Sequence, residues 1–581
     1  MSSQLAVVDH REIEDPYSPT RSRRPRWSAE AAVFLGLLAL YLAVAAWLVF
    51  GQHSIMEDAL SRVANASYVI YSREPKLANL GFVWTPLPSL LMMPLLPLKY
   101  LWPALVEQGF LANVMSAVVM AASARALTGL LGALGVARKA SIGLAIAFGL
   151  QPMIIWFGAN GMTEALLLLF LLLTARELVQ WLTDNDFRHL MGAGAYLALG
   201  YLTRYEMLAA GCAAIALVGA VTWWRTAGGR VARRQGAFAD VLLIAAPLVA
   251  AFTLWAVASW VIVGHPFDQF SSRYGNSALV ESGASASSIE LTLLPIQWLV
   301  LAPLLPLAAI AVIVDAVRRR DLTILPPVGL FLAVIAFEAL VYFAGSLFGF
   351  LRYQIVVIPL FATLVGYLLA QPHGPVPASL HQNATLHAPG GPSGMEAAPS
   401  GRRPSRRRLA PLVVALAMIP GILTSAYTFM YQREYASQEW GRLRPAVLAT
   451  MGYEVAQNSS SNGAFDTDRE IAAFLDARRL PPGTVVIDSG SGFAVIAASA
   501  NPRQFVITSD RDFHGAVVDP VGHDVRYLLL NAGPSQFDEI AATWPDLAAG
   551  RSNVFWAKRA VVFPSGGQPG AHEWTLWQVD P

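Results

Sequence analysis

Two adjacent carboxylates are the first candidate functional residues of this chain. The stretch Met56-Glu57-Asp58 begins five residues after the end of the first long apolar run. A carboxylate at a membrane surface can act as a general base towards a polar acceptor that meets a lipid-borne donor. Acidic residues also favour the first turn of a surface helix, where they face the positive end of the helix dipole. The dipeptide alone leaves both interpretations open.

Other charged residues stand at the ends of later apolar runs, where ionisable groups are costly and usually functional. They are Glu164, the turn Thr203-Arg204-Tyr205-Glu206, and the pair Arg352-Tyr353. The planar fork of an arginine can bind two oxygens of one phosphate. Alternatively, Arg204 and Arg352 extend towards lipid headgroups and pair with Glu164 and Glu206.

The composition predicts the environment that must position these residues. Of the 581 residues, 55% are apolar and only 14% are charged, which is typical of a polytopic α-helical membrane protein. The formal net charge of +2 indicates no nucleic-acid partner. A single cysteine, Cys212, excludes an intrachain disulfide and a multi-cysteine metal site.

About eleven apolar runs have the length of membrane spans. We expect them at 31–51, 105–127, 140–157, 164–182, 190–203, 207–223, 239–263, 292–316, 322–345, 351–370 and 409–430. The first is too long for the core of a signal peptide and predicts an uncleaved anchor. Residues 86–103 are apolar but contain five prolines, so a re-entrant or interfacial segment is expected there.

The distribution of lysine and arginine predicts the orientation. With residues 1–30 as a disordered cytoplasmic tail, the main arginine clusters fall in cytoplasmic loops, and the external loops receive few basic residues. An odd number of spans then places the C-terminus outside. We expect an integral protein of a bacterial plasma membrane, with a cytoplasmic N-terminus and an extracytoplasmic C-terminal domain.

The domains follow from this topology. A transmembrane core covers 31–370, with a first external loop at 52–104. A Pro/Gly/Ser-rich, basic cytoplasmic linker covers 371–408 and is expected to be disordered, and the last span covers 409–430. Residues 431–581 alternate helix-like and strand-like segments, which predicts a small α/β domain. Gly490-Ser491-Gly492 lacks the full dinucleotide spacing, so no cofactor is predicted.

On this topology the charged residues converge on the outer surface. Glu57, Asp58, Glu164, Arg204 and Arg352 all map there, with carboxylates suited to proton abstraction and arginines suited to a phosphate. Arg273, in the loop 264–291, is a further candidate for a phosphate contact.

Other residues are considered for supporting and metal-binding roles. Tyr205, Glu206, Tyr353 and Trp84 are expected to support the site, Trp84 either as a platform for a sugar or as an interfacial anchor. A divalent cation could bridge Glu57, Asp58 and a phosphate. Two adjacent carboxylates are too few ligands, so no metal site is predicted.

The placement of these residues resembles the GT-C glycosyltransferases, in particular the protein O-mannosyltransferase and aminoarabinose-transferase-like group. The resemblance covers about residues 31–370. It depends on the acidic pair after the first span, the return through Trp84-Thr85-Pro86-Leu87-Pro88, and three later motifs. These are Asn160-Gly161-Met162-Thr163-Glu164, Leu202-Thr203-Arg204-Tyr205-Glu206 and Arg352-Tyr353.

The resemblance implies transfer of a sugar from a polyprenyl-phosphate carrier on the outer face, by an inverting single displacement. It implies that Asp58 is the base. Glu57 would orient the acceptor or raise the pKa of Asp58 by like-charge repulsion, and Arg204 and Arg352 would hold the donor phosphate. The order Glu-Asp and the sequence Phe82-Val83-Trp84 depart from the mannosyltransferase pattern, which leaves the donor sugar open.

Two other functions remain open from the sequence. A transporter of lipid-linked sugars would use the same arginines, but it commonly has inverted repeats, and none stands out here. A membrane-anchored receptor would act through residues 431–581. The expected partners of a transferase are the polyprenyl-phosphate-linked sugar, a protein, lipid or glycan acceptor, and membrane lipids.

Overall fold

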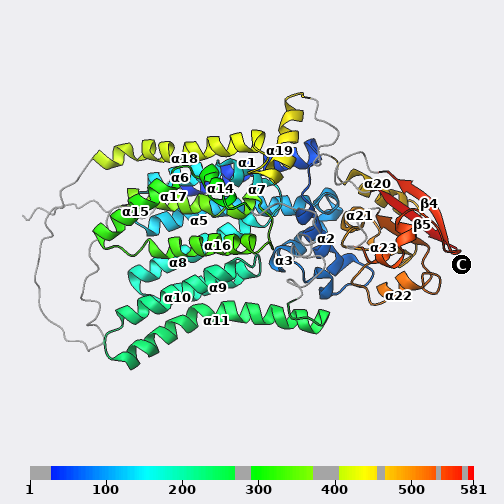
Figure 1. The fold of residues 1–581 in the computed structure, drawn as a ribbon, viewed down its shortest axis with the longest axis horizontal. Helices are drawn as coiled ribbons and strands as arrows, with labels where there is room; N and C mark the ends of the chain where they lie inside the picture. Colours follow the sequence, from blue (N-terminus) through cyan, green and yellow to red (C-terminus); the bar gives the residue numbers. More distant parts are fainter. Residues whose placement is uncertain are drawn as a thin grey trace, which may run out of the picture.

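The computed structural model describes residues 28–267, 290–370, 405–453, 463, 465–531, 538–564 and 573–580. A long bundle of helices occupies one end of the molecule and a small sheet domain the other (Figure 1). The helices α2 and α3 lie between these two parts (Figure 1). The first loop of the chain therefore joins the bundle to the C-terminal domain.

Eight helices in the described part of the chain are long and apolar enough to cross a membrane. They are α1 (Ala29–Ala46) continued by the π-helix η1 (Trp47–Gly51), α5 (Phe110–Ala133), α8 (Glu164–Asp184), α10 (Met207–Arg225), α11 (Arg230–Val263), α16 (Leu325–Phe343), η4 (Leu351–Gln354) with α17 (Val357–Leu369), and α18 (Ser405–Tyr431). Together with the fold class reported below, these helices confirm a polytopic α-helical membrane protein.

Two further expected spans are bent. The pair α6 (Arg138–Gly149) and α7 (Pro152–Ala159) meets at 67°, and the pair α14 (Leu293–Leu301) and α15 (Leu305–Arg319) meets at 79°. Proline removes a backbone donor and cannot continue a helix smoothly, and Pro152 and Pro303 stand at these bends. If each pair counts as one span, the number rises to ten. The remaining expected span, 190–203, is α9 (Phe187–Tyr201), which has only 15 residues.

The proline-rich segment does not form a long helix. The chain leaves the bundle, forms α2 (Glu57–Tyr71) and η2 (Leu77–Leu80), and returns through α3 (Leu87–Met92) and the 3₁₀ helix η3 (Met93–Tyr100). The short helix α4 (Ala104–Glu107) then leads to α5, after Gly109 at φ 64°. Residues 86–103 therefore form short helices and no helix of span length, and the span expected to start at 105 starts at 110.

The C-terminal part contains the expected sheet. Its five strands are ordered β2-β1-β3-β5-β4, with β2, β1 and β3 parallel and the last two pairs antiparallel. They are β1 (Val485–Ile487), β2 (Phe505–Val506), β3 (Tyr527–Asn531), β4 (Ala557–Phe563) and β5 (Trp574–Val579). The accompanying helices are α20 (Asp466–Asp476), α21 (Phe493–Ala498), η6 (Pro502–Gln504), α22 (Phe513–Val518), α23 (Glu539–Thr543) and α24 (Pro545–Ala548).

The helices around this domain differ in part from what the sequence predicts. The stretch 538–549 forms two short helices, α23 and α24, because Pro545 disfavours helical backbone in the residue before it. Residues 405–408, expected in the linker, already belong to α18, while residues 371–404 lie outside the described part. The helix α19 (Ser437–Thr450), which follows the last span, was not predicted.

Ion pairs hold the C-terminal domain to the first loop. Arg73, just beyond α2, donates a hydrogen bond from Nη1 to Asp512 (3.0 Å) and lies 3.2 Å from Asp510. Burial raises the pKa of Asp510 to about 6, although the Arg73 guanidinium acts in the opposite direction. The α2 helix itself also contacts both parts, because it packs on α5 of the bundle and on α21 of the C-terminal domain.

Candidate active site

A close contact between two backbone segments places the acidic pair. Glu57 and Asp58 form the first turn of α2, as expected for residues at a helix N-terminus. The next residue, Ala59, packs on the turn before α8, where Gly161 adopts φ 81°. A Cβ atom on Gly161 would lie 2.8 Å from the Cβ of Ala59, so this approach requires glycine. The turn thereby brings Asp58 towards Glu164.

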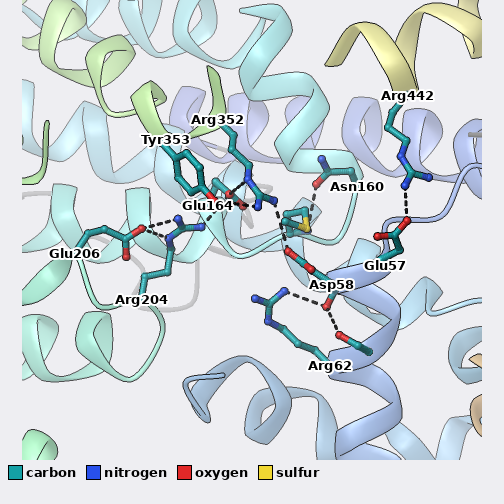
Figure 2. A network of polar contacts seen from close by, with 12 residues as sticks. Glu57, Asp58, Arg62, Asn160, Glu164, Arg204, Glu206, Arg352, Tyr353 and Arg442 are labelled. Carbon is teal, nitrogen blue, oxygen red and sulfur yellow. Dashed lines mark hydrogen bonds and ion pairs between the residues drawn. The ribbon is translucent and has the colours of Figure 1, made fainter. Parts of the chain in front are cut away.

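Asp58 faces Arg352, which lies in η4, near the C-terminal end of the core sequence. Its Oδ2 lies 3.5 Å from Nη1 of Arg352, whose Nε lies 4.0 Å from Oε1 of Glu164 (Figure 2). Arg352 and Glu164 are buried, and 29% of the Asp58 side chain is exposed. A carboxylate that solvent can reach is therefore combined with a buried guanidinium.

Arg204 completes this cluster. Its Nη1 donates a hydrogen bond to Glu164 (2.8 Å), and its Nε and Nη2 donate to Glu206 (2.8 and 2.5 Å). Burial alone would lower the pKa of Arg204, but the carboxylates of Glu206 and Glu164 raise it well above its usual value. Burial alone would raise the pKa of Glu206, and contact with Arg204 lowers it. We call Asp58, Glu164, Arg204, Glu206 and Arg352 the arginine–carboxylate network.

The two arginines of the network differ in how fully their donors are used. All three nitrogens of the Arg204 guanidinium donate to carboxylates. Arg352 donates from Nη2 to the Tyr353 hydroxyl (3.3 Å), and its buried Nε has no hydrogen-bond partner in the described part of the chain. Its ion pairs with Asp58 and Glu164 are longer than direct hydrogen bonds. Arg352 therefore retains donor capacity for an incoming anion.

Hydrogen bonds tie the returning loop to the Arg204 turn. Tyr205 donates its hydroxyl to the carbonyl of Val83 (3.1 Å), and Thr85 donates to the carbonyl of Thr203 (2.5 Å). In addition, the Leu87 amide donates to the Leu202 carbonyl (2.9 Å). These contacts give Tyr205 a positioning role between two segments that are far apart in the sequence.

Trp84 packs against Arg62, a buried arginine of α2. The guanidinium of Arg62 lies 4.7 Å from the centre of the Trp84 ring and donates a hydrogen bond to the backbone carbonyl of Asp58 (3.0 Å). Burial lowers the pKa of Arg62, and the Asp58 carboxylate opposes this effect. Trp84 and Arg62 thus support the first turn of α2.

Glu57 points away from the network. Its carboxylate accepts a hydrogen bond from Nη2 of Arg442 (2.5 Å), a residue of α19, and 57% of the side chain is exposed (Figure 2). Glu57 and Asp58 thus contact different arginines. Within the described ranges, no three His, Cys, Asp or Glu side chains are grouped so that they could hold a metal ion.

The helix α19 also contributes Glu439, which sequence reasoning missed. Glu439 is fully buried, and neither of its carboxylate oxygens accepts a hydrogen bond from another described residue. Burial raises its pKa to about 7, whereas the Arg352 guanidinium lowers it. No signal in the sequence indicated Glu439, because its burial depends on how α19 folds back after α18.

The structure brings together most of the residues singled out in the sequence. Asp58, Glu164, Arg204, Glu206, Arg352 and Tyr353 lie in one cluster, with Glu57, Trp84 and Tyr205 beside it. The pairing of Arg204 with Glu164 and Glu206, which was the structural alternative, is found as well. Arg273 lies outside the described residues.

Comparisons with known proteins address the fold. No protein-family model matches the chain, and no curated protein sequence matches it. Among solved structures, ArnT from Cupriavidus metallidurans bound to undecaprenyl phosphate is similar over 94% of this chain and 97% of its own, with 13% identity and a TM-score of 0.52.

Two other membrane proteins are also similar in structure, with lower TM-scores. The oligosaccharyltransferase AglB from Archaeoglobus fulgidus matches 86% of this chain and 69% of its own (12% identity, TM-score 0.39). A chain of the S. cerevisiae O-mannosyltransferase complex Pmt1-Pmt2 matches 45% of this chain and 37% of its own (15% identity, TM-score 0.32).

The similarity to ArnT over nearly the whole of both chains establishes the fold class. The protein is an integral membrane protein with a GT-C-like helical core and a small C-terminal sheet domain. The resemblance inferred from the sequence motifs is confirmed at the level of the fold.

Proposed function

We propose that the protein is a membrane glycosyltransferase that moves a sugar from a polyprenyl phosphate to an acceptor hydroxyl. The observation that supports this most strongly is the contact between Asp58, a partly exposed carboxylate, and Arg352, a buried guanidinium whose Nε has no hydrogen-bond partner among the described residues. A base and an anion-binding group within 3.5 Å of each other suit a displacement at a sugar–phosphate bond. The similar ArnT structure holds undecaprenyl phosphate, which fits a lipid-phosphate donor.

The chemistry follows from the positions of these side chains. Asp58 accepts the proton of the acceptor hydroxyl as the hydroxyl oxygen attacks the anomeric carbon. The bond between that carbon and the phosphate oxygen breaks, and the polyprenyl phosphate leaves with the electron pair. Arg352 binds the phosphate oxygens and neutralises their charge. Because the acceptor attacks the face of the sugar opposite the leaving phosphate, the anomeric configuration is inverted.

Arg204 has a different role in this proposal. Its donors are occupied by Glu164 and Glu206, so it fixes Glu164 beside Arg352. Glu57 and Arg442 lie next to Asp58 on the exposed side, where an acceptor would approach.

The location is also part of the proposal. The arginine clusters in alternate loops favour a cytoplasmic N-terminus, which puts the site and the C-terminal domain on the outer face of a bacterial plasma membrane. The acceptor is a protein, lipid or glycan that is present there.

The test is sugar release from a panel of radiolabelled polyprenyl-phosphate sugars, with purified wild type and Asp58→Asn in detergent. We expect wild-type turnover with one donor and a loss of about 10²- to 10⁴-fold in Asp58→Asn, the range for removal of a general base. Donor binding without turnover in the wild type would contradict transfer and favour a transporter. Unchanged turnover in Asp58→Asn would remove Asp58 from its role.

A further inference from the structure

A groove lined by both charged and apolar residues lies on the part of the bundle away from the candidate active site. It has a volume of about 540 Å³ and is formed by α5, α6, α8 and the start of α1. Its charged and smallest lining residues are Glu30, Arg125, Arg138, Arg176, Gly129 and Gly132. Arg176 follows Glu164 by twelve residues on α8, which corresponds to about 18 Å along the helix axis. The groove is therefore distinct from the arginine–carboxylate network.

The groove has an excess of positive charge. Arg138 donates a hydrogen bond to Glu30 (3.0 Å), which neutralises both side chains. The guanidinium groups of Arg125 and Arg176 have no hydrogen bond or ion pair with any residue in the described ranges. Both arginines belong to helices that are apolar enough to span a membrane, where a charged side chain normally has a partner. Two unpaired positive charges thus face one cavity.

The remaining walls indicate what kind of anion fits. On α5 and α8, Ala122 and Leu169 extend the groove from the arginines towards the middle of the bundle. Gly132 leaves open space, because a Cβ atom built on it meets no other atom within 4 Å. An apolar wall that continues from a cationic end suits an amphiphile with a phosphate headgroup better than a free ion.

We propose that this groove binds an anionic glycerophospholipid, with the headgroup phosphate between Arg125 and Arg176 and an acyl chain along Ala122 and Leu169. The lipid comes from the leaflet at the end of the bundle opposite the candidate active site. A zwitterionic lipid fits less well, because its ammonium group would add a positive charge near two arginines that one phosphate already compensates only in part.

Native mass spectrometry of the delipidated full-length protein tests the proposal, with phosphatidylglycerol and phosphatidylcholine as probes. The double variant Arg125→Gln with Arg176→Gln removes both cations. The control is Arg230→Gln with Arg234→Gln, which removes the same charge from the first turns of α11. We expect phosphatidylglycerol to bind at least about tenfold more weakly to the double variant, and less than about twofold more weakly to the control.

A second variant keeps the charges and fills the cavity. Gly132→Leu places a side chain in open space on α5, so it is expected to fold while excluding the lipid. Loss of phosphatidylglycerol binding in this variant would support the groove as the site.

Three results would overturn the proposal. One is equal phosphatidylglycerol affinity of wild type, the double variant and Gly132→Leu. Another is equal affinity of the wild type for phosphatidylcholine. The third is displacement of the lipid by millimolar inorganic phosphate, which would identify a site for a free anion. Because the readout is lipid binding, the proposed glycosyl transfer is tested separately.

Discussion

Buried carboxyl groups have cationic partners in one region of the molecule and lack them in another. In the arginine–carboxylate network, the buried carboxylates Glu164 and Glu206 are each within 2.8 Å of a guanidinium nitrogen. In the C-terminal region, Glu439, Asp468 and Asp538 are buried without an ion pair to any described cation. Burial raises the pKa of Glu439 and Asp468 to about 7 and that of Asp538 to about 6.

The carboxylates in these two regions therefore favour different protonation states. Those paired with a guanidinium favour the charged form, and those buried without one favour the protonated form. A guanidinium stabilises the charged form of a neighbouring carboxylate, and contact with Arg204 accordingly lowers the pKa of Glu206. A carboxylic acid without such a partner is protonated more easily when it is buried. The network therefore has a role that depends on charge, whereas the C-terminal carboxyl groups make stability depend on pH.

Removal of Arg204 gives the largest expected effect on stability. Arg204→Gln leaves two buried carboxylates without their guanidinium, and breaking a buried ion pair from one side costs about 3–5 kcal/mol. We expect a lower unfolding temperature in detergent than for Arg352→Gln, whose ion pairs are longer. Equal unfolding temperatures for the two variants would break the distinction drawn between the arginines.

The shared location of these charged residues could be predicted from the sequence, but the difference between the two arginines could not. Arg204, Glu206, Glu164 and Arg352 stand at the ends of apolar runs, so their shared location follows from helix length and the alternation of spans. The division of labour between Arg204 and Arg352 depends on side-chain distances, which no spacing encodes.

The contributions of α19 were out of reach for a related reason. Arg442 contacts Glu57 across 385 positions, and this contact depends on how the chain folds back after α18. The sheet was predicted from its alternating segments, because strand patterns are local. The bends at Pro152 and Pro303 were not predicted, although the prolines were visible, because proline inside an apolar run is compatible with a bend or with an uninterrupted span.

Glu439 gives the next largest effect, as a dependence of stability on pH. A folded-state pKa raised from 4.5 to about 7 means that the folded state retains the proton more strongly than the unfolded state. The contribution of Glu439 to the free energy of unfolding is therefore highest below pH 4.5. It falls by roughly 3 kcal/mol as the pH rises to about 7. Asp468 and Asp538 act in the same direction.

Thermal unfolding at pH 5 and pH 8 checks this sign. We expect the wild type to unfold at a lower temperature at pH 8, and Glu439→Gln to reduce the difference. Glu434→Gln, in which an exposed carboxylate is replaced, serves as the control and should retain the wild-type difference. A wild type that is more stable at pH 8 than at pH 5 would contradict the account of the C-terminal carboxyl groups.

The smallest expected effect concerns the link between the two regions. Arg442→Gln and Glu57→Gln each remove a partly exposed ion pair, which contributes at most about 1 kcal/mol, so kcat/KM should fall by no more than about fivefold. The double variant should resemble either single variant. A loss as large as that of Asp58→Asn would assign Glu57 a direct role in the reaction.

In the proposed reaction, Arg352 binds the donor phosphate while Asp58 removes a proton. These two roles are separated by equilibrium binding of the donor identified by the turnover panel, compared for wild type, Asp58→Asn and Arg352→Gln. We expect Asp58→Asn to bind the donor as tightly as wild type does, and Arg352→Gln to bind it at least about tenfold more weakly. Wild-type affinity in Arg352→Gln would exclude Arg352 as the group that binds the phosphate.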